Sequence, residues 1–331
     1  MLRALTARRI ATAAAYGGGG ITALGGLTFG LVVLEARLAR RLIGATPNGG
    51  PPAADGLYGP VAAGRPLSLV VLGDSTAAGL GVAAPEETPG AMLAEGLAAT
   101  AGRPVRLTIV ARSGARSHAL SGQVDAALRV RPDLAVIMIG ANDVTSRTPA
   151  AESVRHLADA VERLRGAGCR VVAGTCPDLG TVEPLMQPLR WIARRASRQL
   201  AAAQMIAVVE HGGRAVSVGD LLGPEFAADP PAMFSADRYH PSARGYATAA
   251  AALLPSMAHA LGLVPDPVVA RLGEDVLPVY LAAAAAAEVS GTELYGVSVA
   301  GRERGRWAAL LRRRPAPAGA RPIGSASPRV A

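Results

Sequence analysis

Leu67–Gly81 reads LSLVVLGDSTAAGLG, and this stretch decides the fold and the candidate site. It begins with an apolar, β-branched run, which is typical of a strand buried on both faces of a parallel sheet. The run ends at Gly73, and Asp74 and Ser75 follow directly. Open α/β sheets bind ligands beyond the carboxyl ends of their strands. Ser75 is therefore a candidate catalytic residue, although an ordinary Gly/Ser/Asp turn has the same composition.

Strand and helix patterns alternate from this stretch onward. Strands are predicted at Leu67–Leu72, Val105–Val110, Leu134–Ile139, Arg170–Thr175 and Ala215–Val218. Helices are predicted at about 88–101, 117–129, 151–167, 184–210 and 241–261. Alternation with nearly continuous apolar strands implies a parallel sheet covered by helices on both faces. The order predicts a flavodoxin-like, three-layer α/β/α sandwich with a five-stranded parallel sheet.

The net charge of +9 does not indicate a nucleic-acid-binding protein. Residues 1–44 hold six Arg and one acid, and residues 263–331 hold nine Arg and six acids. The region between them, 45–262, is almost neutral, with 19 Arg and 18 acids. The chain also has few aromatic residues and no zinc-finger spacing or basic face, so we expect no nucleic-acid partner.

The N-terminal region contains an uncharged segment of 25 residues, Ile10–Leu34. That length can span a bilayer, and no small-x-small cleavage site of a signal peptide follows the segment. We therefore predict an uncleaved signal-anchor helix within residues 1–44, attached to the membrane through residues 10–34. Three arginines on each side leave its orientation open. The alternative is a Gly-rich buried helix.

Composition divides the rest of the chain into three parts. Residues 45–66 are rich in Pro and Gly and are predicted to be a linker. The alternating pattern occupies residues 67–262. Residues 263–331 are an Ala-rich and then Arg/Pro-rich extension, with a partly disordered composition. Cys169 and Cys176 lie at opposite ends of one predicted strand, farther apart than a disulfide can reach, so we expect no bond between them.

Residues suited to catalysis follow other predicted strands at the same edge as Ser75. Gly114 follows the second strand, Asn142 the third, and the pair Asp237 and His240 follows the fifth. An acid and a histidine three residues apart can meet if the chain turns, and Pro241 favours such a turn. Proline also prefers the first position of a helix, which predicts that His240 lies at the positive end of helix 241–261. That position favours the neutral imidazole of a general base.

These residues together supply the parts of an acyl-transfer site. Ser75 is the candidate nucleophile, His240 its base and then the acid for the leaving group, and Asp237 the group that fixes the histidine tautomer. An oxyanion hole needs two or three converging donors. The backbone N–H groups of Ser75 and Gly114 and the side-chain amide of Asn142 suit that role.

Gly79 and Gly81 are spaced like part of a dinucleotide-binding fingerprint, but they lie well past the strand and Pro85 interrupts any helix that would follow. We therefore expect no dinucleotide cofactor, and we interpret the two glycines as room for a substrate. Turn acids commonly bond to their own backbone, so Asp74 and Asp143 are expected to brace their loops.

The set of residues resembles four of the sequence blocks of the SGNH (GDSL-type) hydrolase family, the blocks that supply Ser, Gly, Asn and His. Gly73-Asp74-Ser75 resembles the first block, Ser113-Gly114 the second, Gly140-Ala141-Asn142-Asp143 the third and Asp237-x-x-His240 the fifth. The resemblance covers about residues 67–262. One departure is Thr76, which stands where the GDSL name expects leucine.

The resemblance implies the three-layer fold and an esterase, lipase, thioesterase or carbohydrate deacetylase that uses no metal or other cofactor. We expect a carboxylic ester hydrolase that forms an acyl-enzyme on Ser75 and acts on a small ester such as a lipid or an acylated sugar. An envelope acyltransferase or a carbohydrate O-deacetylase with the same triad is an alternative, and a non-catalytic envelope binding module is another.

The sequence leaves the substrate and the oligomeric state open. Acyl-chain length depends on the loops around 81–90, 144–150, 176–187 and 221–236, which are expected to shape the pocket. Anchored esterases commonly act on envelope lipids or glycans, and by that analogy we expect an extracytoplasmic catalytic domain.

Overall fold

The structure is a computed structural model of the chain. It describes residues 30–39, 41, 50–60, 64–265, 276–288, 292–297 and 307–312. The predicted membrane segment 10–34 lies outside these ranges except for residues 30–34, which begin a helix over 30–39. Within the described ranges, no helix combines the length and the apolar character needed to cross a bilayer.

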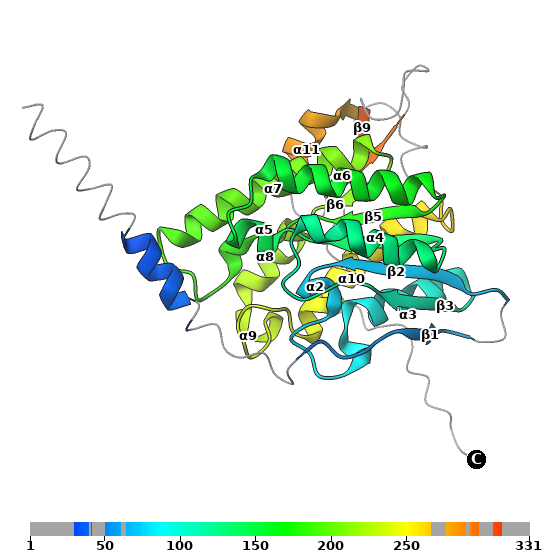
Figure 1. The fold of residues 1–331 in the computed structure, drawn as a ribbon, viewed down its shortest axis with the longest axis horizontal. Helices are drawn as coiled ribbons and strands as arrows, with labels where there is room; N and C mark the ends of the chain where they lie inside the picture. The colour runs from blue at the N-terminus through cyan, green and yellow to red at the C-terminus, as the bar shows by residue number, and fades with distance from the viewer. Residues whose placement is uncertain are drawn as a thin grey trace, which may run out of the picture.

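Five parallel strands form the centre of the sheet (Figure 1). In order across the sheet they are β3 (Val105–Ile109), β2 (Leu67–Gly73), β4 (Leu134–Met138), β5 (Arg170–Gly174) and β6 (Arg214–Val216). The predicted five-stranded parallel sheet and its flavodoxin-like order are confirmed. Because the five strands are parallel, their carboxyl ends meet at one edge, where α/β proteins place their sites.

Strand β2 shows why this sequence makes a three-layer sandwich. Leu69 and Val71 point into the core on one side of the sheet, and Val70 and Leu72 point into the core on the other. All four side chains are completely buried. Burial on both faces explains why the run is continuously apolar and does not alternate with polar residues.

Helices cover both faces of the sheet (Figure 1). One face packs against α3 (Pro89–Ala101), α8 (Val218–Ala228), α9 (Pro230–Met233) and α10 (Ala243–Ala260). The other packs against α4 (Leu120–Arg129), α6 (Ala150–Gly166), α7 (Leu189–Glu210) and α11 (Val279–Glu288). The shorter elements are α2 (Ser75–Ala78), α5 (Ala141–Thr145), and the 3-10 turns η2 (Pro85–Glu87), η3 (Ser117–Ala119) and η4 (Leu179–Thr181).

Antiparallel strands extend the sheet at both sides. β1 (Gly56–Tyr58) pairs with β3, so part of the predicted linker 45–66 belongs to the sheet. On the other side, β8 (Thr292–Gly296) pairs with β6, and β9 (Trp307–Arg312) and β7 (Val276–Pro278) follow it. The sheet therefore continues beyond residue 262, the predicted end of the hydrolase domain.

The interpretation of 221–236 as a loop is wrong, because α8 and α9 occupy most of it. Helix α9 starts where local chemistry favours a start: Pro230 is its first residue, and the Asp229 side chain accepts a hydrogen bond from the Ala232 N–H. The predicted strand to Val218 ends at Val216 instead, and Val218 begins α8.

Candidate active site

Ser75 lies on a sharp turn between β2 and α2. Gly73 has φ +139°, and a Cβ atom there would lie 1.9 Å from the carbonyl oxygen of Met138, so only glycine fits. The next N–H, that of Asp74, donates to this same carbonyl at 3.1 Å. The Asp74 carboxylate then accepts a hydrogen bond from the Thr76 N–H at 3.0 Å and caps α2. The turn thus presents Ser75 at the carboxyl edge of the sheet.

A continuous series of hydrogen bonds joins Ser75, His240 and Asp237. The His240 Nε2 atom lies 3.0 Å from Ser75 Oγ, and Nδ1 lies 2.6 Å from Asp237 Oδ2. With the proton on Nδ1, the imidazole donates to Asp237 and accepts from the Ser75 hydroxyl at Nε2. The structure therefore brings together three residues predicted from the sequence, although 165 residues separate Ser75 from His240.

The second oxygen of Asp237 holds the turn that carries His240. Asp237 Oδ1 accepts hydrogen bonds from the Ser235 hydroxyl at 2.7 Å and from the backbone N–H groups of Tyr239 and His240 at 2.9 Å each. Arg238, within the turn, adopts a left-handed backbone with φ +58°. Asp237 is only 1% exposed. Burial alone would raise its pKa, but hydrogen bonds from His240, Ser235 and Tyr239 outweigh burial and lower the pKa below its ordinary value.

The predicted start of the last helix at Pro241 is wrong. Helix α10 begins at Ala243, and the Ser242 hydroxyl caps it by accepting a hydrogen bond from the Gly245 N–H at 3.2 Å. Pro241 forms an isolated bridge with Phe234 instead. His240 therefore lies outside the first turn of α10, and its orientation comes from Asp237.

The three predicted oxyanion donors lie in neighbouring turns at the same edge. Gly114 has φ +77° in a turn that is tied to β2, because the Arg112 N–H donates to the Gly73 carbonyl at 3.1 Å. The Asn142 side-chain amide donates to the Ala115 carbonyl at 3.0 Å, which uses one of its two N–H groups. Within the described part of the chain, the N–H groups of Ser75 and Gly114 donate no hydrogen bond. These donors are therefore available to an anionic ligand.

Two buried glutamines, which the sequence analysis did not identify, hold the strand ends that carry these residues. Gln123 on α4 accepts from the Gly73 N–H at 2.7 Å and donates to the Gly73 carbonyl at 2.8 Å. Gln204 on α7 donates to the Ile139 carbonyl at 3.0 Å and accepts from the Cys176 N–H at 2.7 Å. Each side chain thus satisfies backbone groups that the sheet leaves unpaired at the active edge.

The two acids that were expected to brace their loops behave differently. Asp143 is fully buried and accepts hydrogen bonds from the Ser117 N–H, the Ser117 hydroxyl and the Ser153 hydroxyl. Asp74 is also buried, but it lines the cavity beside Ser75. Burial raises the pKa of Asp74 to about 6, against the lowering effect of the Thr76 N–H and of nearby His240.

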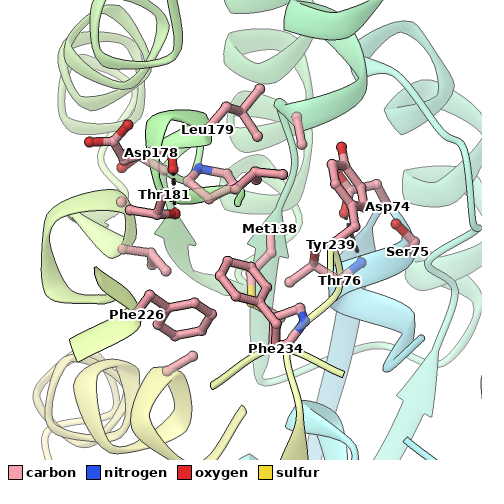
Figure 2. A pocket seen from close by; sticks show the side chains of 18 of the residues that line it. Asp74, Ser75, Thr76, Met138, Asp178, Leu179, Thr181, Phe226, Phe234 and Tyr239 are labelled. Carbon is pink, nitrogen blue, oxygen red and sulfur yellow. Dashed lines mark hydrogen bonds between the residues drawn. The ribbon is translucent and has the colours of Figure 1, made fainter. Parts of the chain in front are cut away.

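A small apolar cavity of about 70 Å³ lies beside Ser75. In Figure 2, Asp74 and Ser75 lie at one side of the cavity, and Leu179 and Phe226 lie across it. The Phe226 and Phe234 rings meet edge to face, with centroids 4.7 Å apart. The cavity is apolar apart from the groups around Ser75 and a few residues of the 175–181 segment.

Gly79 and Gly81 do not provide room for a substrate, which corrects that interpretation. Gly79 has φ +85° and ends α2, and a Cβ atom there would meet the Thr88 side chain at 2.6 Å. Gly81 has φ +108°, and a Cβ atom there would lie 2.9 Å from His240 Cβ. Both glycines therefore permit close packing, and Gly81 lets the first turn approach the histidine turn.

The two cysteines are both free and buried. Burial raises the pKa of each thiol above its ordinary value, so Cys176 is a buried apolar side chain although it lies near the active edge. In the part of the chain that the structure describes, no three His, Cys, Asp or Glu side chains are grouped as metal ligands would be.

Solved structures that are similar to this chain include the following two. One is the crystal structure of TesA, with 25% identity and a TM-score of 0.45 over 60% of this chain and 99% of that chain. The other is a catalytic mutant of Axe2, an acetylxylan esterase from Geobacillus stearothermophilus. It has 20% identity and a TM-score of 0.47 over 60% of this chain and 97% of that chain.

Sequence comparison identifies the family. The chain is 46% identical over 263 residues to the GDSL-like esterase Rv1075c of Mycobacterium tuberculosis (strain ATCC 25618 / H37Rv), which covers 76% of this chain and 83% of the relative. Residues 71–248, more than half of the chain, match the model of the GDSL-like Lipase/Acylhydrolase family. The chain therefore belongs to the GDSL-like lipase/acylhydrolase family and is a carboxylic ester hydrolase.

Proposed function

We propose that the protein cleaves carboxylic esters through an acyl-enzyme on Ser75. The observation that carries this proposal is the unbroken hydrogen-bond series from Ser75 Oγ through His240 to Asp237. As Oγ attacks the ester carbonyl carbon, its proton passes to His240 Nε2. The Asp237 carboxylate, which hydrogen bonds keep ionised, stabilises the imidazolium that forms.

The negative charge that develops on the carbonyl oxygen is received by donors at the carboxyl edge. The Ser75 and Gly114 N–H groups and the remaining amide N–H of Asn142 are suited to this role, since they are fixed before the substrate binds. One such donor contributes about 3 kcal/mol to lowering the barrier. The hydrogen bonds from Gln123 to Gly73 and from Asn142 to Ala115 hold two of these donors in place.

The protonated His240 then gives its proton to the leaving alcohol oxygen, the C–O bond breaks, and the acyl group remains on Ser75. Water attacks this acyl-enzyme with His240 as the base, which releases the carboxylic acid and restores the Ser75 hydroxyl. Each cycle therefore consumes one ester and one water and yields one acid and one alcohol.

The size of the cavity beside Ser75 favours a short acyl group. A volume of about 70 Å³ holds only a few atoms, and the side chains of Met138, Phe226 and Phe234 are among those that line it. An acetyl or propionyl group fits such a space, whereas a long acyl chain does not. We therefore expect the rate of hydrolysis to fall as the acyl chain lengthens.

The test uses the full chain with p-nitrophenyl acetate and a fluorophosphonate probe. We expect hydrolysis, and we expect mass spectrometry to locate one phosphonate group on Ser75. Ser75→Ala removes both, while the control Ser121→Ala, at an exposed serine on α4, retains both. Activity that survives in Ser75→Ala would contradict the proposal. Preferential transfer of the acyl group to an added alcohol or sugar, in place of water, would assign an acyltransferase instead.

A further inference from the structure

A second apolar groove of about 740 Å³ lies next to the cavity at Ser75. Its walls come mainly from three segments that are distant in the sequence: the helix over 30–39, the stretch 144–150 from the end of α5 to the start of α6, and the first turns of α7. A volume of this size matches sites that bind small organic ligands. The residues of the helix over 30–39 lie outside the family match at 71–248, so this wall is an addition to the family domain.

The helix over 30–39 is fixed to the domain by a specific contact. The Glu35 carboxylate accepts a hydrogen bond from the Leu189 N–H at 2.9 Å, across 154 residues of sequence. Leu189 is the first residue of α7, and its N–H has no partner inside that helix. The positive end of α7 also favours the negative charge of Glu35. Glu35 and Ala39 are both buried, so the helix packs closely against the domain.

The groove and the Ser75 cavity share Leu179 and Tyr239 in their linings. Tyr239 directly precedes His240, and the two rings meet edge to face with centroids 5.0 Å apart. The groove therefore runs up to the flank of His240. In the reaction proposed above, His240 delivers its proton to the leaving alcohol, so the alcohol part of the ester lies on this side of the site.

We infer that this groove binds the alcohol part of the substrate, and that the preferred substrates are short-acyl esters of long apolar alcohols. The groove is lined mainly by Val, Ala, Leu and Ile side chains, with one charged side chain, Arg147. An alkyl chain gains from leaving water in such a groove, roughly fourfold in binding for each buried methylene. The small cavity at Ser75 accepts the acyl group, and the groove accepts the rest.

Because this inference rests on the proposed ester hydrolysis, the test uses two isomeric esters that contain the same atoms. Hexyl acetate has a short acyl group and a long alcohol, and ethyl hexanoate has the reverse. We expect the full-length protein to hydrolyse hexyl acetate with a kcat/KM at least tenfold above that for ethyl hexanoate. Ethyl acetate serves as the reference with no long chain, and 1-octanol should inhibit competitively.

Ala36 and Ala196 both line the groove, one on the helix over 30–39 and the other on α7. Ala36→Phe and Ala196→Phe should each lower kcat/KM for hexyl acetate about tenfold and weaken inhibition by 1-octanol, while kcat/KM for ethyl acetate stays within twofold. The matched control is Leu34→Phe, on the same helix but 61% exposed and outside the lining. Leu34→Phe should leave kcat/KM for all three esters unchanged.

The outcomes separate this inference from the proposed function. If the protein hydrolyses no ester, the proposed function fails. If it hydrolyses ethyl acetate but prefers ethyl hexanoate to hexyl acetate, the groove holds an acyl chain and the inference is overturned. Hexyl acetate activity that is unaffected by both phenylalanine variants overturns it too. Unchanged ethyl acetate activity in the variants shows that they are folded.

Discussion

Two turns meet at the active edge, and each carries a buried carboxyl group close to His240. Asp74, in the strand-end turn, is 2% exposed, and Asp237, in the histidine turn, is 1% exposed. Burial raises the pKa of Asp74 to about 6, whereas the pKa of Asp237 lies below its ordinary value. Asp74 lies deeper in the protein than Asp237, and the Thr76 N–H is the main hydrogen-bond donor to its carboxylate, whereas Asp237 accepts four hydrogen bonds. The two carboxyl groups therefore have pKa values shifted in opposite directions, and below about pH 6 Asp237 stays ionised while Asp74 is largely protonated.

The largest effect is expected for Asp237→Asn. The amide is nearly the same size but cannot carry the charge that stabilises the protonated His240, and it favours the wrong tautomer. We expect kcat to fall about ten-thousand-fold with little change in KM. Steady-state kinetics on p-nitrophenyl acetate measure this, and circular dichroism checks the fold. A loss below tenfold would mean that Asp237 only shapes the turn.

Asp74→Asn is expected to change stability more than rate, because asparagine still caps α2. The folded-state pKa of Asp74, about 6, lies above the unfolded value, so the folded protein binds more protons between pH 4 and 6. Its free energy of unfolding therefore falls as pH rises through that window, by about 3 kcal/mol from this group. The variant lacks this decrease and should be more stable than the wild type above pH 6.

Urea unfolding at pH 4, 6 and 8 tests this prediction, with Asp159→Asn at an exposed position on α6 as the control. Asp237 contributes with the opposite sign: its lowered pKa adds stability above about pH 4, and this stability is lost as pH falls. Identical pH profiles for the wild type and Asp74→Asn would show that folding does not shift the pKa of Asp74.

Gly81→Ala tests how closely the two turns must approach. The added Cβ atom would lie 2.9 Å from both His240 Cβ and the Pro241 carbonyl oxygen, so the histidine turn must move. A displacement of about 1 Å at a reacting group lowers the rate by roughly 100-fold. The control is Gly64→Ala, which has a similar φ of +90° but open space around it. Equal losses in both variants would point to backbone strain alone.

The smallest effect is expected for Ser235→Ala, which removes one of the four hydrogen bonds to Asp237. The remaining bonds keep the carboxylate ionised at neutral pH, so kcat/KM should fall only about fivefold. The pKa of Asp237 then rises, so the stability that is lost at acidic pH is lost at a higher pH than in the wild type. Ser235→Thr keeps the hydroxyl and should restore the rate. A loss as large as that of Asp237→Asn would contradict this assignment.

The central fold could be predicted because its information is local. Five apolar runs alternate with segments of helical periodicity, and this alternation predicts the strands and a parallel sheet. The antiparallel strands beyond residue 262 could not be predicted in this way. Glu293 in β8 has the side chain of an exposed residue, yet it is fully buried and pairs with Arg214 at 2.7 Å. Such pairing depends on a strand 79 residues away.

The candidate site likewise contains residues that could be predicted from the sequence and residues that could not. Asp237 and His240 could be paired from their spacing, and Ser75, Gly114 and Asn142 from their positions after strands. The role of Gln123 could not be predicted from the sequence. Its partner is the backbone of Gly73, 50 residues away, and a glutamine in a helix is ordinarily exposed. The wrong start of α10 had a local cause: the prediction relied on Pro241 alone, whereas the Ser242 hydroxyl caps the helix one residue later.

The pairing of β8 with β6 determines which strand lies at the edge of the sheet. β6 is the last parallel strand, and β8 covers its outer N–H and C=O groups. A chain that ended at residue 262 would expose these groups as an open edge, and such edges recruit strands from other molecules and lead to aggregation. Residues of the C-terminal region thus pair with the edge of β6 and make β7 the edge strand on this side, a contribution that the family match at 71–248 does not reveal.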